Sequence, residues 1–559
     1  MGSGDLGGGG AEFWRAEAER LAADNVALRA QVAELEDQIG ALAEKVSVLA
    51  KLAFGTSSEK AVRPAVDTGA GDPGDPGDGA KRGRGQQRGS RGHGRRDYSH
   101  LPTHEEIHDV PEAERVCPRC GADYAPFGEQ SCEQLDWQVS LTRIVHRRPT
   151  YRRTCRCPVR GVLVAPPVPK VIGKGRFTTG FVTRLLCEKF VLGRPVHRIV
   201  AALAHDGLDL AEGTLAGVFA ACSDLLAPLA DKISERNAAG GHLYVDETRW
   251  QVFAAVEGKD SHRWWCWVFL GPDTTVFTIA PSRSLKVLTT QLGVEHDPDT
   301  GALPESLPGG RRLLLSSDFY TVYQSVGRLD GVDNLWCWAH IRRYFVRAGD
   351  AHPDLQAWTA AWLERIGTLY RAHSALAAAP TGSPLRAEAA AQFDAALQVI
   401  DRERHAQAAT AHLMHPAAVK VLATLDREWD GLVRHREFPE LPLDNNSAER
   451  ALRGPVVGRK NFYGSGSTVS AELASRVWTI TATAERAGLN PRAYLGAYLN
   501  QCAQTGGTPP SGTALDRFLP WALNPDDRTA WAPRPDPAEP DTTADTTGAD
   551  PPAESTRVA

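Results

Sequence analysis

Three isolated carboxylates in this chain could work together on a phosphate group. Asp246 lies inside a strand-like run, Asp318 ends another, and Glu449 lies early in a helix-forming stretch. A carboxylate inside an apolar strand must be paired or must hold a cation, because burying it alone costs too much free energy. Such oxygen ligands suit Mg²⁺ or Mn²⁺, and two of these ions ~3.5–4 Å apart can act on both the attacking and the leaving oxygen of a phosphodiester.

Simpler roles for the same residues stay open. Aspartates at strand ends often cap a turn or pair with a cation, and Asn446-x-x-Glu449 has the spacing of a helix capping box. Basic residues after Glu449 favour the chemical role, since the DNA backbone must be held beside the reacting phosphate. We expect Arg453, Arg459 and Lys460 to bind phosphates; the alternative is a solvated helix face.

The distribution of charge also favours DNA as a partner. The net charge is −5, but two runs, 81–96 and 143–160, contain several basic residues and no acid. Local patches rather than net charge set the affinity for phosphates. The sequence therefore predicts DNA binding.

Cysteine spacing predicts a structural zinc ion. We expect it to be held by four thiolates: Cys117, Cys120, Cys155 and Cys157. The first pair has the Cys-x-x-Cys-Gly form that lets two thiolates face one zinc ion. Only one residue separates the second pair, so Cys132 or His146 could replace a ligand. The alternative is a set of buried or redox-inert thiols.

Before these residues, the N-terminal part of the chain has two distinct segments. Leucines recur every seven residues from Leu21 to Leu49, with Asn25 at a core position. This pattern predicts a parallel coiled-coil dimerisation helix over 11–54, and the alternative is an amphipathic helix packed on its own domain. The Gly-, Pro- and Arg-rich stretch 61–97 has little to bury and predicts a disordered basic linker.

The rest of the chain predicts several domains around an α/β core. Strand-like runs alternate with helical patterns, which is typical of a mixed sheet covered by helices. A helix-turn-helix-like pattern precedes the core as a candidate DNA-binding region, although any three-helix packing gives the same pattern. The predicted segments are a zinc-binding module at 100–170, the helical region at 175–237, the α/β core at 240–345 and 440–485, an all-α insertion at 346–439, C-terminal helices at 486–522 and a disordered acidic tail at 523–559.

Nine short motifs are spread from the predicted coil to residue 521. They are AFGTSSEK at 53–60, CPRCG at 117–121, DETRW at 246–250, SDFYTVY at 317–323, CWAHIRRYF at 337–345, DNNSAERALR at 444–453, GRKNF at 458–462, NPRAYL at 490–495 and LPW at 519–521. In these motifs the chain resembles the insertion-sequence-66 family of DDE-type transposases. It departs from the family in having Cys-x-Cys at 155–157 where the family more often has Cys-x-x-Cys.

The resemblance implies a ribonuclease H-like catalytic core that is interrupted by the helical insertion. It implies that Asp246, Asp318 and Glu449 are the catalytic carboxylates and the ligands of Mg²⁺ or Mn²⁺. It also implies cleavage at the terminal inverted repeats of an insertion sequence, joining of the 3′ ends to target DNA, and accessory proteins encoded by the same element. The zinc ion would then be a structural cofactor only.

Two other functions fit part of the same pattern. A catalytically silent, dimeric, zinc-containing DNA-binding protein derived from a transposase needs no carboxylate triad, so the presence of all three acids argues against it. A plain nuclease would share the chemistry without joining strands. No apolar run approaches the ~18 residues of a membrane span, and the N-terminus lacks a signal-peptide core. We therefore expect a cytoplasmic, nucleoid-associated protein.

Overall fold

The computed structural model describes residues 110–111, 114–115, 118–120, 122–123, 140–152, 154, 162–257, 259, 261–297 and 299–533. These residues belong to one of two compact units, Arg96–Ala559. The predicted coiled coil at 11–54 and the linker at 61–97 lie outside the described residues. So do Cys117, Cys132, Cys155 and Cys157, so the zinc site stays a prediction. Of the proposed ligands that the structure describes, Cys120 and His146 are both exposed.

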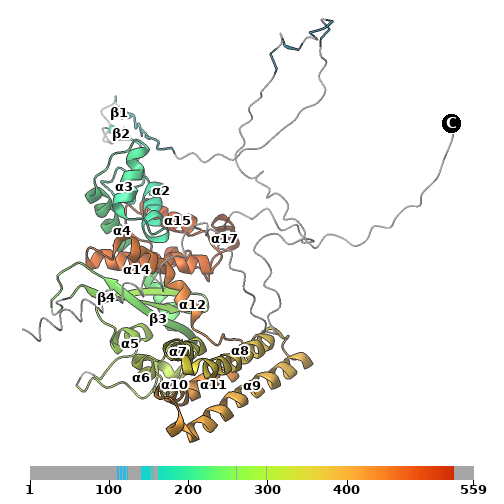
Figure 1. Ribbon diagram of the computed structural model, residues 1–559. Coiled ribbons are helices and arrows are strands. Elements are labelled where there is room, and N and C mark those ends of the chain that lie inside the picture. The colour runs from blue at the N-terminus through green and yellow to red at the C-terminus, as the bar shows by residue number, and fades with distance from the viewer. Residues whose placement is uncertain are drawn as a thin grey trace, which may run out of the picture. The chain divides into compact units, whose positions relative to one another are not determined.

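A mixed five-stranded sheet forms the centre of the described region, which confirms the α/β prediction (Figure 1). In chain order its strands are β3(His242–Gln251), β4(Arg263–Leu270), β5(Thr275–Ala280), β6(Leu313–Ser317) and β7(Val332–Trp336). Their order across the sheet is β5-β4-β3-β6-β7. The first three pair antiparallel, while β6 runs parallel to β3 and β7 parallel to β6. Runs of β-branched and aromatic residues such as RWWCWVFL in β4 favour these strands.

Helices lie on both sides of this sheet (Figure 1). Three of them connect or follow the strands: α5(Leu285–Leu292), α6(Thr321–Val326) and α7(Trp338–Ala351). After the insertion come α12(Asn446–Ala451), α13(Arg453–Phe462) and α14(Thr468–Arg486). α12 packs on β3 and β4, and α14 packs on β5. The stretch that carries Glu449 therefore returns to the central strands although the insertion separates it from them in sequence.

The edge strand β5 is covered by hydroxyl groups of α14. Ser475, Thr479 and Thr483 lie four residues apart on one helix face, and each accepts a hydrogen bond from a β5 backbone N–H at 3.0–3.1 Å. An unpaired strand edge is a template for pairing with another chain, and a buried N–H without a partner is costly. These three side chains remove both problems at this edge of the sheet.

The insertion between α7 and α12 is helical, as the Ala-rich composition of 346–439 predicts. It contains α8(Gln356–Ala378), α9(Pro384–Ala409), α10(Pro416–Arg427) and α11(Trp429–Val433), with short 3-10 turns at Pro353–Leu355, Ala411–Leu413 and Arg434–Arg436. The indole of Trp338 donates to the carbonyl of Leu432 at 2.9 Å, and the Trp338 N–H donates to Leu443 at 2.9 Å. The insertion is thus fastened to the start of α7, at the end of the sheet where β6 and β7 finish.

A second helical group packs against α14. It comprises α2(Thr179–Leu186) with the π-helix Cys187–Val191, α3(Val196–His205), α4(Glu212–Ala238), α15(Pro491–Gln504), α16(Thr513–Asp516) and α17(Pro525–Ala530). The Trp478 indole of α14 donates to the carbonyl of Phe190 at 2.9 Å. A short antiparallel hairpin of β1(Thr150–Arg152) and β2(Val162–Val164) precedes this group, and all six of its residues are exposed.

One expectation from the sequence is wrong in this part of the chain. We expected disorder from residue 523 onward, but α17 is helical and Trp531 stacks on Phe518 with 5.6 Å between ring centroids. Among the helices of the described region, α4 alone is long and apolar enough to cross a membrane by length and composition. Leu226, Leu229 and Ile233 of α4 are fully buried, and α4 packs against α14, so α4 is a core helix of this region.

Candidate active site

Asp246 lies on β3, and Asp318 directly follows Ser317, the last residue of the neighbouring strand β6. The parallel pairing of β3 with β6 runs from His242 opposite Leu314 to Tyr244 opposite Ser316. Continuing this register by two residues sets Asp246 opposite Asp318. Residues at matching positions of parallel strands lie on the same face of the sheet. The register therefore brings together two of the carboxylates that were predicted from the sequence.

Glu449 comes to the same place because Asn445 fastens the start of α12 to the sheet. The buried Asn445 side chain donates to the carbonyl of Val245 at 2.8 Å, one residue before Asp246, and the Asn445 N–H donates to the Cys337 sulfur at 3.2 Å. Glu449 lies in the first turn of α12, and its side chain is 35% exposed. The capping box considered for Glu449 does not form, since the N-cap of α12 makes no side-chain cap bond.

The electrostatics of Asp246 show that the three carboxylates interact. Burial is the main cause that raises the pKa of Asp246 from 3.8 to about 8, and the charges of Glu247, Asp318 and Glu449 raise it further. Only the backbone N–H of Glu247, which donates to Asp246 Oδ1 at 2.8 Å, acts in the opposite direction. A group with this pKa holds its proton near neutral pH unless a cation approaches. No cation among the described residues therefore offsets the negative charge of Asp246.

The donor types at this site fit a hard divalent cation. Mg²⁺ and Mn²⁺ prefer carboxylate and carbonyl oxygens, and mutual repulsion among carboxylates is relieved when such an ion binds. Two buried polar atoms beside the carboxylates, Asn445 Oδ1 and His340 Nδ1, have no hydrogen-bond partner among the described residues. In the present arrangement, however, no three His, Cys, Asp or Glu side chains of the described region are grouped closely enough to hold a metal ion. Binding would therefore draw the carboxylates together.

Sequence reasoning missed a buried network around Glu247. The Glu247 side chain is 1% exposed, forms an ion pair with Arg283 and accepts a hydrogen bond from the hydroxyl of Tyr323. Arg283 lies over the Tyr320 ring, 3.8 Å from its centroid, and the Tyr320 N–H donates to Asp318 Oδ1 at 2.9 Å. The network thereby links the strand of Asp246 to the turn that holds Asp318. The sequence did contain a sign of this network, because Glu247 is a second acid inside the same apolar strand as Asp246.

Sequence reasoning also missed the face of α7 that lies beside the carboxylates. Arg343 forms an ion pair with Glu449 at 3.6 Å. Burial lowers the pKa of His340, while the charges of Asp318 and Glu449 oppose that shift and those of Arg343 and Arg347 add to it. His340, Arg343 and Arg347 follow one another at intervals of three and four residues, so they share a face of α7. The motif CWAHIRRYF contained His340 and Arg343, and Arg347 lies two residues after it.

The three residues predicted to bind phosphate differ in exposure and in hydrogen bonding. Arg453 and Lys460 are exposed on α13. Arg459 instead donates to Thr248 Oγ1 at 3.1 Å and to the carbonyl of Arg249, so it fastens α13 to β3. The interpretation of Arg459 as a free phosphate ligand is therefore weakened, because its guanidinium already bonds to the sheet.

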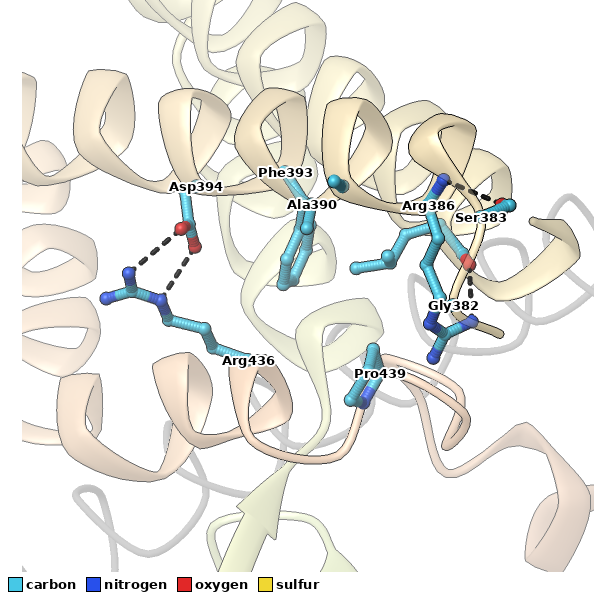
Figure 2. Close-up of a pocket in the computed structure, with 10 residues that line it drawn as sticks. Gly382, Ser383, Arg386, Ala390, Phe393, Asp394, Arg436 and Pro439 are labelled. Atoms are coloured by element: carbon cyan, nitrogen blue, oxygen red, sulfur yellow. Dashed lines mark hydrogen bonds and ion pairs between the residues drawn. The ribbon is translucent and has the colours of Figure 1, made fainter. Parts of the chain in front are cut away.

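An open hollow of about 420 Å³ lies in the helical insertion, away from the carboxylates (Figure 2). Phe393 and Ala390 of α9 lie in its wall, and Arg436 closes one end through an ion pair with Asp394 at 2.7 Å. The hollow contains no carboxylate free of a cation and no nucleophile near a base. It offers no chemistry comparable to that of the site on β3, β6 and α12.

Comparison with known proteins gives a family and several relatives. A model of the family described as "Transposase IS66 family" matches residues 174–473, which include Asp246, Asp318 and Glu449. Three similar proteins come from Sinorhizobium fredii (strain NBRC 101917 / NGR234), and all are described as uncharacterized. Protein y4jD is 26% identical and covers 90% of this chain and 96% of its own length. Protein y4qI is 26% identical over 76% of each chain, and y4hP is 23% identical over 74% of each.

Proposed function

Because the chain belongs to the IS66 family of transposases, we propose that it is a DNA transposase that cuts and joins DNA strands with Asp246, Asp318 and Glu449. It would cleave phosphodiesters at the terminal inverted repeats of an insertion sequence and join the freed 3′ ends to target DNA. The observation that carries this proposal is the convergence of the three acids: the β3–β6 register, when continued by two residues, sets Asp246 opposite Asp318, and Asn445 holds the helix of Glu449 against β3.

The topology supports a ribonuclease H-like core as part of this proposal. Three antiparallel strands are followed by two strands that run parallel to the first, and helices connect the later strands. The helical insertion interrupts this arrangement between α7 and α12. In such a layout the acids come from the middle of the first strand, the end of the fourth and a later helix. They are therefore far apart in sequence and close in space.

When bound, Mg²⁺ or Mn²⁺ held by Asp246, Asp318 and Glu449 would stabilise the charge on the attacking and leaving oxygens of the phosphodiester. The residues of the chain hold the acids in place. The Tyr320 N–H orients Asp318, and the Glu247 N–H orients Asp246. On α7, Arg343 and Arg347 add positive charge beside the carboxylates, where a DNA backbone must lie.

The reaction then proceeds in two displacements at phosphorus. Water attacks the phosphodiester at each end of the element, and the bond to the 3′ oxygen breaks, which leaves a free 3′-hydroxyl. That hydroxyl attacks a phosphodiester of the target in line, and a 3′ oxygen of the target leaves. The exposed side chains of Arg453 and Lys460 would bind backbone phosphates during both steps. A structural zinc ion, dimerisation through the N-terminal coil and accessory proteins of the same element remain part of this proposal.

One assay separates this function from a silent DNA-binding protein and from a plain nuclease. The full-length chain is incubated with Mg²⁺ and with linear DNA that carries the inverted repeats flanking its gene, together with a target plasmid. We expect cleavage at the repeat ends and joined products, and we expect neither from Asp318→Asn. Cleavage without joining would indicate a nuclease. Binding without cleavage by the unaltered protein would indicate the silent protein.

A further inference from the structure

Tyr463, directly after α13, has a strained backbone. Its φ is 65° and its ψ is −31°, and it is the one non-glycine residue with positive φ in the described part of the chain. The Gly464 N–H donates to the Phe462 carbonyl at 2.8 Å, which closes a three-residue γ-turn around Tyr463. A γ-turn with positive φ is rare and strained, and glycine would adopt it at lower cost. Such strain persists only where neighbouring residues impose it.

The residues before Tyr463 are fixed to the π-helix segment of the helical group. The Asn461 side chain donates to the carbonyl of Gly193 at 2.9 Å. The ring of Phe462 lies under the ammonium group of Lys189, which is 3.2 Å from the ring centroid. The last turn of α13 therefore cannot move without breaking contacts to Cys187–Val191 and the loop after it.

The residues after Tyr463 are fixed to the end of β3. The Ser465 N–H donates to the Gln251 carbonyl at 2.8 Å, and the Phe253 N–H donates to the Ser465 carbonyl at 2.8 Å. A side chain at Gly464 would come within 2.2 Å of the Gln251 oxygen, so only glycine permits this approach. The turn at Tyr463 is thus imposed from both sides.

The side chain of Tyr463 contributes little to this arrangement. It is 71% exposed, and its ring makes no aromatic contact and its hydroxyl no hydrogen bond with any described residue. Replacing it by glycine would relieve the strain without removing a contact within the described region. The large aromatic ring at this position is therefore available for contact with a partner.

The surroundings of Tyr463 match those of a site for nucleic acid. Lys460 of the same helix is exposed, and Phe253, which bonds to the same loop, is 46% exposed. Exposed aromatic rings beside cations are the usual way in which proteins hold unpaired bases, since every base has a face that can stack. The loop joins β3 at Gln251 and Val252. That is roughly 17–20 Å from Asp246 along the strand, at ~3.3 Å per residue.

We propose that the ring of Tyr463 stacks on a nucleobase of the DNA held at the carboxylate site. This inference rests on the proposed function for the identity of the ligand. Bases follow one another at ~3.4 Å along a strand, so the stacked base would lie about five or six nucleotides from the phosphate at Asp246. The stacking would fix the position of the DNA end relative to the carboxylates and would be tolerant of base identity.

The test uses the full-length chain and DNA ends in which 2-aminopurine, whose fluorescence is quenched by stacking, replaces one base at a time. We expect quenching to be strongest about five or six nucleotides from the cleaved phosphate in the unaltered protein and in Tyr463→Phe. In Tyr463→Ala and Tyr463→Gly the quenching should disappear, and the affinity should fall on the order of 10-fold. Tyr463→Gly should melt no lower than the unaltered protein. Leu413→Ala, which shortens a side chain that is 77% exposed in the insertion, should change neither value.

The proposal is overturned by undiminished quenching in Tyr463→Ala, by the absence of any quenched position in the unaltered protein, or by loss of quenching in Tyr463→Phe. These outcomes are separate from the fate of the proposed function. Asp318→Asn should keep the quenching and lose cleavage. An unaltered protein that quenches but never cleaves would contradict the proposed function and leave the stacking site in place.

Discussion

Glu247 and Asp246 are neighbours on β3, yet only one of them has its charge balanced within the described region. Glu247 has Arg283 and the Tyr323 hydroxyl as partners, whereas Asp246 forms no ion pair there and is surrounded by other acids. Successive residues of a strand face opposite sides of the sheet, so two adjacent acids can have opposite environments. Glu247, whose charge is balanced by Arg283, supports the strand. Asp246 has no such partner in the described region and is available to a cation.

We predict that Tyr323→Phe destabilises the protein because it leaves one oxygen of a fully buried carboxylate without its donor. The free energy of unfolding should fall by about 1–3 kcal/mol, measured by urea denaturation. Tyr370→Phe is the matched control, because its hydroxyl makes no hydrogen bond with the described residues, and it should change stability by less than about 0.5 kcal/mol. Equal losses in the two variants would show that the hydroxyl of Tyr323 does not support Glu247.

Asp246, Asp318 and Glu449 could be predicted as site residues from the sequence alone, and their catalytic role stays a prediction. The side chains that orient them could not. Tyr320 lies only two residues after Asp318, but Arg283 acts on Glu247 from another part of the chain, and Arg343 reaches Glu449 across more than a hundred residues. Such partners are set by how elements pack, and a single sequence shows only local spacing. The bonds of Arg459 to Thr248 and Arg249 could not be predicted for the same reason, because those two residues are distant in sequence.

At the scale of elements, α14 does more than cover the sheet. Its hydroxyl groups accept hydrogen bonds from the N–H groups of three alternate β5 residues, so helix and edge strand form one unit. The sequence predicted a helix there from its apolar residues and did not reveal this role, because Thr and Ser on a helix face usually indicate solvent. The strands and helices themselves follow from local patterns, whereas the strand order across the sheet does not.

We predict that Thr479→Val destabilises the protein by about 1–3 kcal/mol, because it leaves the buried Phe277 N–H without an acceptor while keeping the shape of the side chain. Thr479→Ser keeps the hydroxyl and should recover most of this loss. Thermal and urea denaturation measure both variants, and light scattering after heating should show earlier aggregation for Thr479→Val because β5 is an edge strand. If valine and serine behave alike, the hydroxyl does not protect this edge.

At the scale of the whole molecule, the fold brings acids from three distant parts of the chain near enough for Asp318 and Glu449 to raise the pKa of Asp246. The helical insertion separates β7 from α12, and the bonds of Trp338 to Leu432 and Leu443 bring its two ends back together. Family membership was predicted from the motifs and is confirmed by the match over residues 174–473. The coiled coil and the zinc ligands were also predicted from local spacing, and they remain predictions because the coil and the expected ligands Cys117, Cys155 and Cys157 lie outside the described residues.

The most direct test of the proposed transposase compares charge removal at Glu449 with charge removal at the nearest other acid, Asp444. Asp444 accepts from the Asn446 N–H at 3.1 Å and so shapes the turn before α12. Strand cleavage is measured on linear DNA with the element's ends in the presence of Mg²⁺, with folding and end binding checked for each variant. We expect Glu449→Gln to fold and bind but to lose cleavage and joining by roughly 10³-fold or more, as for residues that act as a unit. Asp246→Asn and Asp318→Asn should behave alike, combinations should add little, and Asp444→Asn should cleave at a near-normal rate. Full cleavage by Glu449→Gln, or its abolition by Asp444→Asn alone, would contradict the assignment of the three acids.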